Sequence, residues 1–414
     1  MDALVTSGFT DPFRQYGFLI TYNDMNIERI RQDTPGCHDK LFVDTAGASL
    51  VPRQVVDAVQ EYLALEADLG GYRTAEAREE VIRAFYTEAA KLLSCQSHNI
   101  AFVSNATDGY AKALSSVQFQ KGDVILTTDD DYVSNQTNLI SLQNAHGIRV
   151  VRIRNLDNGD LDLDHLSTLL IQHKPKLVSI SHVPTNSGLI QDAKAVGELC
   201  QYHGALFLLD ACQSVGQLQV DVNELKCDFL TVTGRKFLRG PRGTGILYVS
   251  DHALEMGLFP LYVDLRGATW TKPDEYILEK SARRFEFWEC PYALIVGLKE
   301  AIKYANEIGL EVIETYNKEL ISYLRTNLQD IPRVKLLDKG TNLCNILTLV
   351  KDGLTQSQTN KFLKQNNVYH SISRKDNALI DFTKKGHDWA VRLSPHYFNT
   401  REEMDQITSI IKDM

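Results

Sequence analysis

The 414-residue sequence lacks any apolar run that approaches the roughly 18–20 residues of a membrane-spanning helix. Its first residues, Met1–Thr10, lack the basic and apolar regions of a secretory signal peptide. Basic side chains are fewer than acidic ones: the chain has 44 Lys and Arg residues and 53 Asp and Glu residues, which gives a formal charge of −9. The chain also has no basic run that could bind a phosphate backbone. We therefore expect a cytoplasmic protein that contacts neither a membrane nor nucleic acid.

Cysteine is present, but its spacing does not indicate cross-links or a metal site. The seven cysteines are an odd number, lie far apart along the chain, and include no Cys-x-x-Cys pair. Disulfide frameworks and structural zinc sites need paired or clustered cysteines. We therefore expect free thiols, most of them buried, and no metal.

Short apolar segments alternate with helical segments through the first two thirds of the chain. The expected strands cover 99–103, 124–127, 150–153, 177–181, 205–209 and 229–232, and the expected helices include 52–67 and 76–93. This alternation is typical of a mostly parallel sheet with helices on both faces. The sequence thus predicts an α/β fold, in which residues 246–249 form a hairpin at the sheet edge.

The pattern changes after about Pro291. Two long helices are expected at 293–308 and 310–328, followed by strands near 334–337, 345–350 and 390–393 and a last helix at 401–412. A chain of this length usually forms more than one domain. We expect an N-terminal segment (1–40) that packs on the small domain, a large domain (41–290) and a small α+β domain (291–414).

Four polar residues follow two buried strands. Asp210 ends one strand and is followed by Gln213, whereas Thr233 ends the next strand and is followed by Lys236. The carboxyl ends of parallel strands meet at the ligand crevice of an open α/β sheet, so these side chains are expected to converge. An Asp and a Lys there suit pyridoxal 5'-phosphate, because the amine can hold it as a Schiff base while the carboxylate keeps its pyridine nitrogen protonated. A neighbouring cation such as Arg235 would lower the pKa of Lys236.

From about Leu41 to the C-terminus, the sequence resembles the class V aminotransferase and cysteine desulfurase family of fold-type I pyridoxal phosphate enzymes. The resemblance is carried by Asp-Ala-Cys-Gln at 210–213, Asp-Val at 221–222, Asp-Phe at 228–229, Thr-Gly-Arg-Lys at 233–236 and Gly-Pro-Arg-Gly-Thr-Gly at 240–245. It implies a large domain with a mostly parallel mixed sheet and a smaller α+β C-terminal domain. It also implies a homodimer with the active site at the subunit interface.

The resemblance implies roles for these four residues and for a phosphate loop. Lys236 is the catalytic residue that carries the cofactor, Asp210 pairs with the pyridinium nitrogen, Gln213 donates to the ring oxygen, and Thr233 binds the phosphate. Residues 102–108 match the family's phosphate loop, in which a strand leads into a helix start whose free N–H groups favour an anion. The expected donors there are Thr107 and the N–H of Ala106.

Three further positions come from the resemblance. Tyr132 stands where the family commonly has a His that stacks on the cofactor ring, and a Tyr can stack equally well. The family places an Asn near the ring; a gapless reading puts Thr185 there, and a one-residue shift puts Asn186, which we favour because its amide suits the role. Arg392 matches the arginine that binds the substrate carboxylate, a role that suits a bidentate guanidinium.

The sequence also departs from the desulfurases. Arg235 replaces a common His, and residues 284–291 read Arg-Phe-Glu-Phe-Trp-Glu-Cys-Pro where desulfurases have Arg-Phe-Glu-x-Gly-Thr-Pro. The threonine that reaches the partner's phosphate is therefore missing. Desulfurases carry a persulfide-forming Cys shortly before the carboxylate arginine, but Asn345 to Val391 contains none. The variant motifs look more like the C–S lyases of the ergothioneine pathway and the isopenicillin-N-epimerase-like members.

We therefore expect a pyridoxal phosphate-dependent lyase that eliminates the Cβ substituent of a cysteine-derived substrate and gives pyruvate and ammonia. A class V aminotransferase or an amino-acid epimerase is the enzymatic alternative. A non-catalytic relative that binds amino acids or proteins is an alternative of another class. The presence of Lys236, Asp210 and Gln213 speaks against that last reading.

Overall fold

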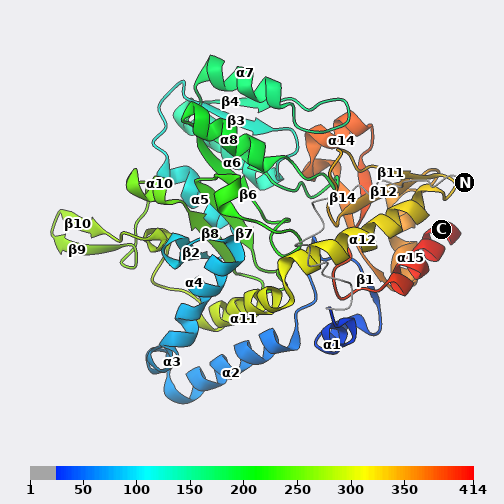
Figure 1. Ribbon diagram of the computed structural model, residues 1–414, viewed down its shortest axis with the longest axis horizontal. Coiled ribbons are helices and arrows are strands. Elements are labelled where there is room, and N and C mark those ends of the chain that lie inside the picture. The colour runs from blue at the N-terminus through cyan, green and yellow to red at the C-terminus, as the bar shows by residue number, and fades with distance from the viewer. Residues whose placement is uncertain (1–24) are drawn as a thin grey trace, which may run out of the picture.

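The structure is a computed structural model and describes residues 25–414. A seven-stranded sheet in the order β2-β8-β7-β6-β5-β3-β4 forms the centre of the large domain (Figure 1). Its strands are β2 (Ile100–Val103), β3 (Val124–Thr128), β4 (Arg149–Ile153), β5 (Leu177–Ser181), β6 (Leu206–Asp210), β7 (Phe229–Thr233) and β8 (Gly245–Val249). From β4 to β7 neighbouring strands run parallel, and β8 is antiparallel to both of its neighbours. The mostly parallel mixed sheet expected from the sequence is therefore confirmed.

β7 and β8 form the expected hairpin, but the prediction that this hairpin lies at the edge of the sheet was wrong. β2 pairs with the other side of β8, from Ile100 opposite Tyr248 to Val103 opposite Gly245. All four residues of β2 are buried, so this strand is covered by helices even though it is the outermost one. The edge could not be read from the sequence, because β2 precedes β8 by more than a hundred residues.

Helices cover both faces of this sheet and bury two apolar cores. One core contains α4 (Glu79–Leu93), α7 (Leu163–His173), α8 (Ala193–His203) and α11 (Tyr292–Ile308), and the other contains α5 (Ala106–Ser116), α6 (Val133–His146) and α10 (Asp251–Glu255). Successive side chains of β5 alternate between the cores, with Val178 and Ile180 in the first and Leu177 in the second. The result is a three-layer α/β domain.

Local signals set the boundaries of the helices beside the site. Asn105 caps α5, because its side-chain oxygen accepts from the N–H of Asp108. Gly147 ends α6 in the left-handed conformation, with φ 68°. α2 (Arg53–Leu69) and α3 (Gly71–Ala77) precede α4, so the helix expected over 76–93 is divided in two near Arg78.

The small domain is built on a four-stranded antiparallel sheet in the order β11-β12-β15-β14. These strands are β11 (Val334–Leu336), β12 (Leu347–Lys351), β15 (Trp389–Leu393) and β14 (Ser371–Arg374), and the domain's helices are α12 (Leu310–Gln329), α13 (Gln356–Gln365), α14 (Leu379–Lys385) and α15 (Arg401–Asp413). α11 packs on α2 and α4, whereas α12 enters the small-domain core. By its contacts α11 therefore lies with the large domain, although the sequence placed it after the expected boundary at residue 290.

The described part of the N-terminal segment lies against the small domain. Helix α1 (Ile27–Gln32) carries Arg31, whose guanidinium lies 2.8 Å from the Glu403 carboxylate in α15. Strand β1 (Leu41–Phe42) pairs with β13 (Val368–Tyr369). These contacts tie residues near the start of the described chain to its C-terminal helix.

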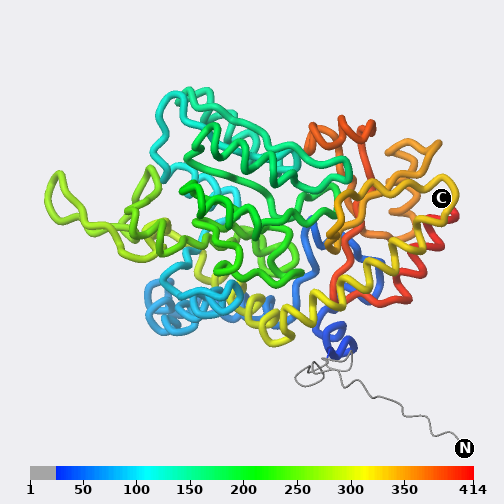
Figure 2. Tube along the Cα trace, turned by 45° about the horizontal axis from the view of Figure 1, so that its top comes forward, coloured from blue at the N-terminus to red at the C-terminus, as the bar shows by residue number. Residues whose placement is uncertain are grey.

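A two-stranded hairpin projects from the large domain. It consists of β9 (Ala268–Lys272) and β10 (Glu275–Leu278), and both views show it extending away from the small domain (Figures 1 and 2). Its apolar side chains Trp270, Tyr276 and Ile277 are exposed. Within the part of the chain that the structure describes, no helix has both the length and the apolar composition to cross a membrane.

Candidate active site

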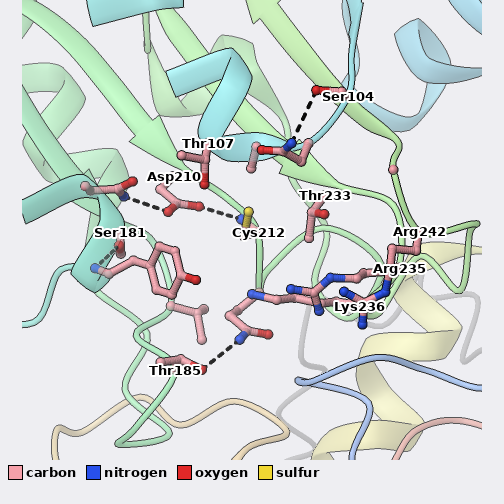
Figure 3. Close-up of a pocket in the computed structure, with 17 residues that line it drawn as sticks. Ser104, Thr107, Ser181, Thr185, Asp210, Cys212, Thr233, Arg235, Lys236 and Arg242 are labelled. Carbon is pink, nitrogen blue, oxygen red and sulfur yellow. Dashed lines mark hydrogen bonds between the residues drawn. The ribbon is translucent and has the colours of Figure 1, made fainter. Parts of the chain in front are cut away.

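A cavity of about 310 Å³ lies at the carboxyl ends of the large-domain strands (Figure 3). Loops that follow β2, β3, β5, β6 and β7 supply its walls, as is usual for an open α/β sheet. Of the nine residues that the sequence singled out, seven line this cavity: Ala106, Thr107, Tyr132, Asp210, Gln213, Thr233 and Lys236. Asn186 and Arg392 do not.

Lys236 lies just beyond β7, with 8% of its surface exposed. Burial lowers the pKa of its amine, and the nearby guanidinium of Arg235 lowers it further. Its Nζ lies 5.7 Å from the centre of the Tyr132 ring. A buried amine with a lowered pKa can act as a nucleophile and as a proton carrier.

Asp210 ends β6 and is also buried. One carboxylate oxygen accepts from Asn135 Nδ2 at 2.7 Å, and the other accepts from the backbone N–H of Cys212 at 3.0 Å. These two donors fix the orientation of the carboxylate at the end of β6. The sequence analysis did not assign a role to Asn135, although it lies one helical turn after Tyr132 and therefore on the same face of α6.

The start of α5 forms a second wall. Ala106 and Thr107 are its first two residues, so their backbone N–H groups belong to the first helical turn and have no partner within the helix. Gly245 of β8 lies directly behind this turn, since a Cβ there would approach within 3.0 Å of the Asn105 backbone carbon. A helix start of this kind is suited to an anion.

Tyr132 is positioned by the loop after β3. Its backbone N–H donates to Ser181 Oγ at 3.2 Å. The neighbouring Asp131 carboxylate accepts from the Ser181 N–H at 2.5 Å and from the Thr127 hydroxyl. Burial raises the pKa of Asp131 to about 6. These bonds connect the ends of β3 and β5 and hold the backbone of Tyr132 in place.

The structure places Thr185 at the cavity in the position for which the sequence analysis favoured Asn186. Thr185 Oγ1 accepts from Gln213 Nε2 at 3.0 Å, whereas Asn186 donates its amide to Asp381 of α14. Asn186 is 3% exposed and faces the small domain. The expectation for Asn186 is therefore corrected, because its amide is used in a contact between the two domains.

Arg392 lies behind Thr185 and outside the cavity lining. Its guanidinium donates to Thr185 Oγ1 at 2.5 Å and lies 3.2 Å from the Asp44 carboxylate. Its Nε is buried and has no hydrogen-bond partner among the described residues. The side chain is thus paired with an acid, yet its Nε–H donor is unused.

The cavity also contains side chains to which the sequence analysis gave no role. Ser181, Cys212 and Arg242 line it alongside Asn135. Cys212 is partly exposed and lines the cavity. Burial and the neighbouring Asp210 raise the pKa of this thiol well above its usual range.

The donors and acceptors of this cavity fit pyridoxal phosphate. The cofactor needs an amine, an acid for its ring nitrogen, an anion cradle for its phosphate and a donor for its ring oxygen. Lys236, Asp210 and the start of α5 supply the first three, and Gln213 brings an amide donor to the cavity, whose Nε2 here donates to Thr185 Oγ1 at 3.0 Å and to the Ala46 carbonyl at 3.2 Å. Fold and site together define a fold-type I pyridoxal phosphate-dependent enzyme.

Comparison with known proteins gives the family. The sequence pattern of the family described as Aminotransferase class-V matches residues 41–407, so the chain belongs to that family. The probable cysteine desulfurase of Methanothermobacter thermautotrophicus is 25% identical over 94% of this chain and 98% of its own length. The probable cysteine desulfurase of Pyrococcus abyssi is 27% identical, with 94% and 97% covered.

Solved structures agree with this assignment. The apo structure of a cysteine desulfurase from Thermococcus onnurineus NA1 superposes with a TM-score of 0.87 at 25% identity and covers 94% of this chain and 98% of that one. The cystine C–S lyase C-DES, in complex with cysteine persulfide, has the same fold, with a TM-score of 0.81, 22% identity and coverage of 92% and 99%. The expected fold and the resemblance to the class V family are confirmed.

Proposed function

We propose that this protein catalyses β-elimination from an S-substituted L-cysteine and releases a thiol, pyruvate and ammonia. The observation that carries the proposal is the buried Lys236 amine, whose pKa is lowered, in the same cavity as Asp210. An amine in this state can take a proton from the substrate Cα. Several relatives are cysteine desulfurases by name, which supports a cysteine-derived substrate.

The overall reaction balances with one water molecule. The Cα–H bond breaks and its proton passes to Lys236 Nζ, while the Cβ–S bond breaks and the sulfur leaves with the electron pair as a thiolate. Water then replaces the amino nitrogen, so that the carbon skeleton ends as pyruvate. Pyridoxal phosphate bound at Lys236 would supply the sink for the electron pair released at Cα.

Each remaining site residue has a proposed part in binding. Ala106, Thr107 and Thr233 would hold the phosphate, and the Asp210 carboxylate would keep the ring nitrogen protonated. Gln213 would donate to the ring oxygen from Nε2, in exchange for one of the two bonds that Nε2 makes to Thr185 Oγ1 at 3.0 Å and to the Ala46 carbonyl at 3.2 Å.

Two further residues would position the ring and the substrate. Tyr132 would stack on the ring, since its own ring lies near Lys236. Arg392 would bind the substrate α-carboxylate through the unused donor at Nε, once Asp44 or Thr185 shifts to admit it.

The proposal includes direct release of the thiol, with no sulfur held on the protein. No cysteine lies between Asn345 and Val391, where a desulfurase carries its acceptor. Cys344 is completely buried, and burial raises the pKa of its thiol to about 12. Burial also raises the pKa of the Cys290 thiol. Thiols held in the protonated form are poor sulfur acceptors.

The finer family relationship and the assembly also belong to this proposal. Residues 235–245 and 284–289 carry the motifs that resemble ergothioneine-pathway C–S lyases and isopenicillin-N-epimerase-like members. We further propose a cytoplasmic homodimer with no nucleic-acid or membrane partner. The exposed apolar side chains on the β9–β10 hairpin support a protein partner surface there.

A product assay with a panel of S-substituted L-cysteines tests the proposal. We expect pyruvate and free thiol in equal amounts from the holoenzyme, and neither product from Lys236→Ala. Alanine in place of pyruvate would indicate a desulfurase, and transfer of the amino group to a keto acid would indicate an aminotransferase. Loss of optical activity without thiol release would indicate an epimerase. Any of these three results would overturn the lyase assignment.

A further inference from the structure

The Asp210 carboxylate is bonded to a side chain that a neighbouring helix supplies (Figure 3). Asn135 of α6 donates from Nδ2 to Asp210 Oδ2 at 2.7 Å. Asn135 is 2% exposed and Asp210 is 5% exposed, and both line the cavity. A hydrogen bond that a carboxylate accepts is stronger than one between neutral groups, so this contact has a large effect on where the carboxylate lies.

The first turns of α6 hold Asn135 in a fixed place. Leu139 lies one turn further on the same face and is completely buried in a core of the large domain. Gln136 donates from Nε2 to Thr127 Oγ1 of β3 at 3.0 Å, and its Oε1 accepts from Arg152 of β4 at 2.8 Å. Asn135 therefore belongs to a helix that is tied to two strands and to the core.

The other donor to Asp210 is local. The backbone N–H of Cys212, only two residues further along the chain, donates to Asp210 Oδ1 at 3.0 Å. Two bonds, one to each oxygen, fix the plane of the carboxylate, whereas one bond leaves it free to turn about the remaining contact. The bond from Asn135 is thus the one that ties Asp210 to α6.

An opposite charge in the same cavity makes this restraint important. Burial lowers the pKa of the Lys236 amine, and the charge of Asp210 opposes that decrease. A direct ion pair would draw the carboxylate towards the amine, because opposite charges attract strongly in a buried site. Asn135 gives the carboxylate a neutral partner on another element and so opposes the formation of that pair.

We propose that Asn135 is a positioning residue, which directs the Asp210 carboxylate to the ring nitrogen of the cofactor and keeps it from pairing with Lys236. This inference rests on the part of the proposed function that pairs Asp210 with the ring nitrogen, and it is independent of the choice of substrate. An amide exchanges no proton in the reaction. The effect of Asn135 therefore reaches the chemistry through Asp210 alone.

Nitrogen NMR of the holoenzyme, loaded with pyridoxal phosphate that is isotopically labelled at the ring nitrogen, tests this role without turnover. The chemical shift reports whether that nitrogen carries a proton. The wild type should show the protonated form. Asn135→Leu, which has nearly the same shape but no donor, should move the signal towards that of Asp210→Asn.

Steady-state kinetics with an S-substituted L-cysteine gives a second readout. In Asn135→Leu, kcat should fall about 10- to 100-fold, the range of one hydrogen bond to a charged group. KM should change by less than about 3-fold, because the inference gives Asn135 no part in substrate binding.

Asn138→Leu is the matched control, because Asn138 lies one turn after Asn135 on α6 and outside the cavity lining. Its Nδ2 is buried and has no hydrogen-bond partner among the described residues, so leucine removes no bond from that nitrogen. This variant should keep the wild-type nitrogen shift and kcat. Asn135→Ala removes the donor without adding volume and should resemble Asn135→Leu in both measurements.

A double variant shows whether Asn135 acts through Asp210. In Asp210→Asn, the addition of Asn135→Leu should lower kcat by less than about 3-fold, because the carboxylate that Asn135 positions is already gone. Three results would overturn the inference: an unchanged nitrogen shift in Asn135→Leu, a full further loss of kcat in the double variant, or an effect on KM alone. A shifted nitrogen signal without pyruvate from any S-substituted cysteine would instead contradict the proposed reaction and leave the role of Asn135 standing.

Discussion

The Asp210 carboxylate accepts hydrogen bonds from two donors. A substitution that keeps the size of this side chain therefore tests the role of its charge alone. Asp210→Asn keeps the size of the side chain but cannot hold the ring proton. We expect kcat to fall about 10²- to 10⁴-fold, the range for a well-placed proton partner. Steady-state kinetics with an S-substituted L-cysteine measures this. Asp157→Asn, at an exposed position, is the control and should keep full activity. Near-normal turnover of Asp210→Asn would mean that the carboxylate is only structural.

His182 makes stability depend on pH. It lies just after β5 with 7% of its surface exposed, and burial lowers its pKa from 6.5 to about 4. Between those values the unfolded chain binds a proton that the folded protein does not, so the stabilisation present above pH 6.5 is lost as the pH falls towards 4. Glu314 and Asp192 oppose this shift only in part.

A variant without the titrating ring measures that loss. Between pH 7 and pH 4, the free energy of unfolding of the wild type should fall by about 3 kcal/mol more than that of His182→Gln. Urea unfolding at the two pH values gives both numbers. If the free energy of unfolding fell equally with pH in the two proteins, His182 would bind its proton in the folded state as readily as in the unfolded chain.

At the scale of elements, an ion-pair network joins the loop after β3 to the small domain. Lys339 Nζ lies 2.5 Å from the Asp130 carboxylate and 2.8 Å from that of Asp381. Both carboxylates are almost completely buried. Because Tyr132 follows Asp130 by two residues, this network fixes the cavity wall as well as the domain contact.

Removing the cation should therefore destabilise the protein. Lys339→Met leaves two buried carboxylates without their shared partner, and we expect the free energy of unfolding to fall by roughly 3 kcal/mol. Lys384→Met is the control, because Lys384 bonds to Asp129 at the same domain contact but is 57% exposed, and its loss should cost less than about 1 kcal/mol. Chemical denaturation of both variants measures the difference. Equal losses of unfolding free energy in Lys339→Met and Lys384→Met would contradict this account.

How well each strand could be predicted from the sequence depended on how deeply its residues are buried. Six of the seven strands of the large sheet, all except β4, are buried on every residue, so their apolar runs stood out. The residues after β6 and β7 could therefore be placed at the ligand edge. The β9–β10 hairpin has almost no buried residue and therefore gave no such signal. The order of β2 and β8 depends on pairing between distant segments, which local patterns do not encode.

The same limit applies to the site. Lys236 and Asp210 follow strands, and their position alone directs them to the crevice. Arg242 lies in an irregular loop, where side-chain direction depends on the folded backbone. The choice between Thr185 and Asn186 was decided by the contact of Asn186 with α14, a partner nearly two hundred residues away.

At the scale of the whole molecule, we expect a homodimer. The β9–β10 hairpin exposes Trp270, Tyr276 and Ile277, and Tyr262 and Leu265 nearby in the chain are also exposed. Clustered apolar exposure of this kind marks a protein interface. Sedimentation should give twice the chain mass of 46.7 kDa, and Ile277→Asp should weaken the dimer. A monomer at every concentration would contradict this expectation.

The central claim is that the carbon–sulfur bond breaks without a protein thiol taking the sulfur. Intact-protein mass spectrometry of the holoenzyme after treatment with L-cysteine tests it most directly. The account predicts an unchanged protein mass, with Cys212, Cys290 and Cys344 all unmodified. A stoichiometric gain of about 32 Da on any of them, lost on reduction, would contradict it, because such a persulfide would make the protein a desulfurase.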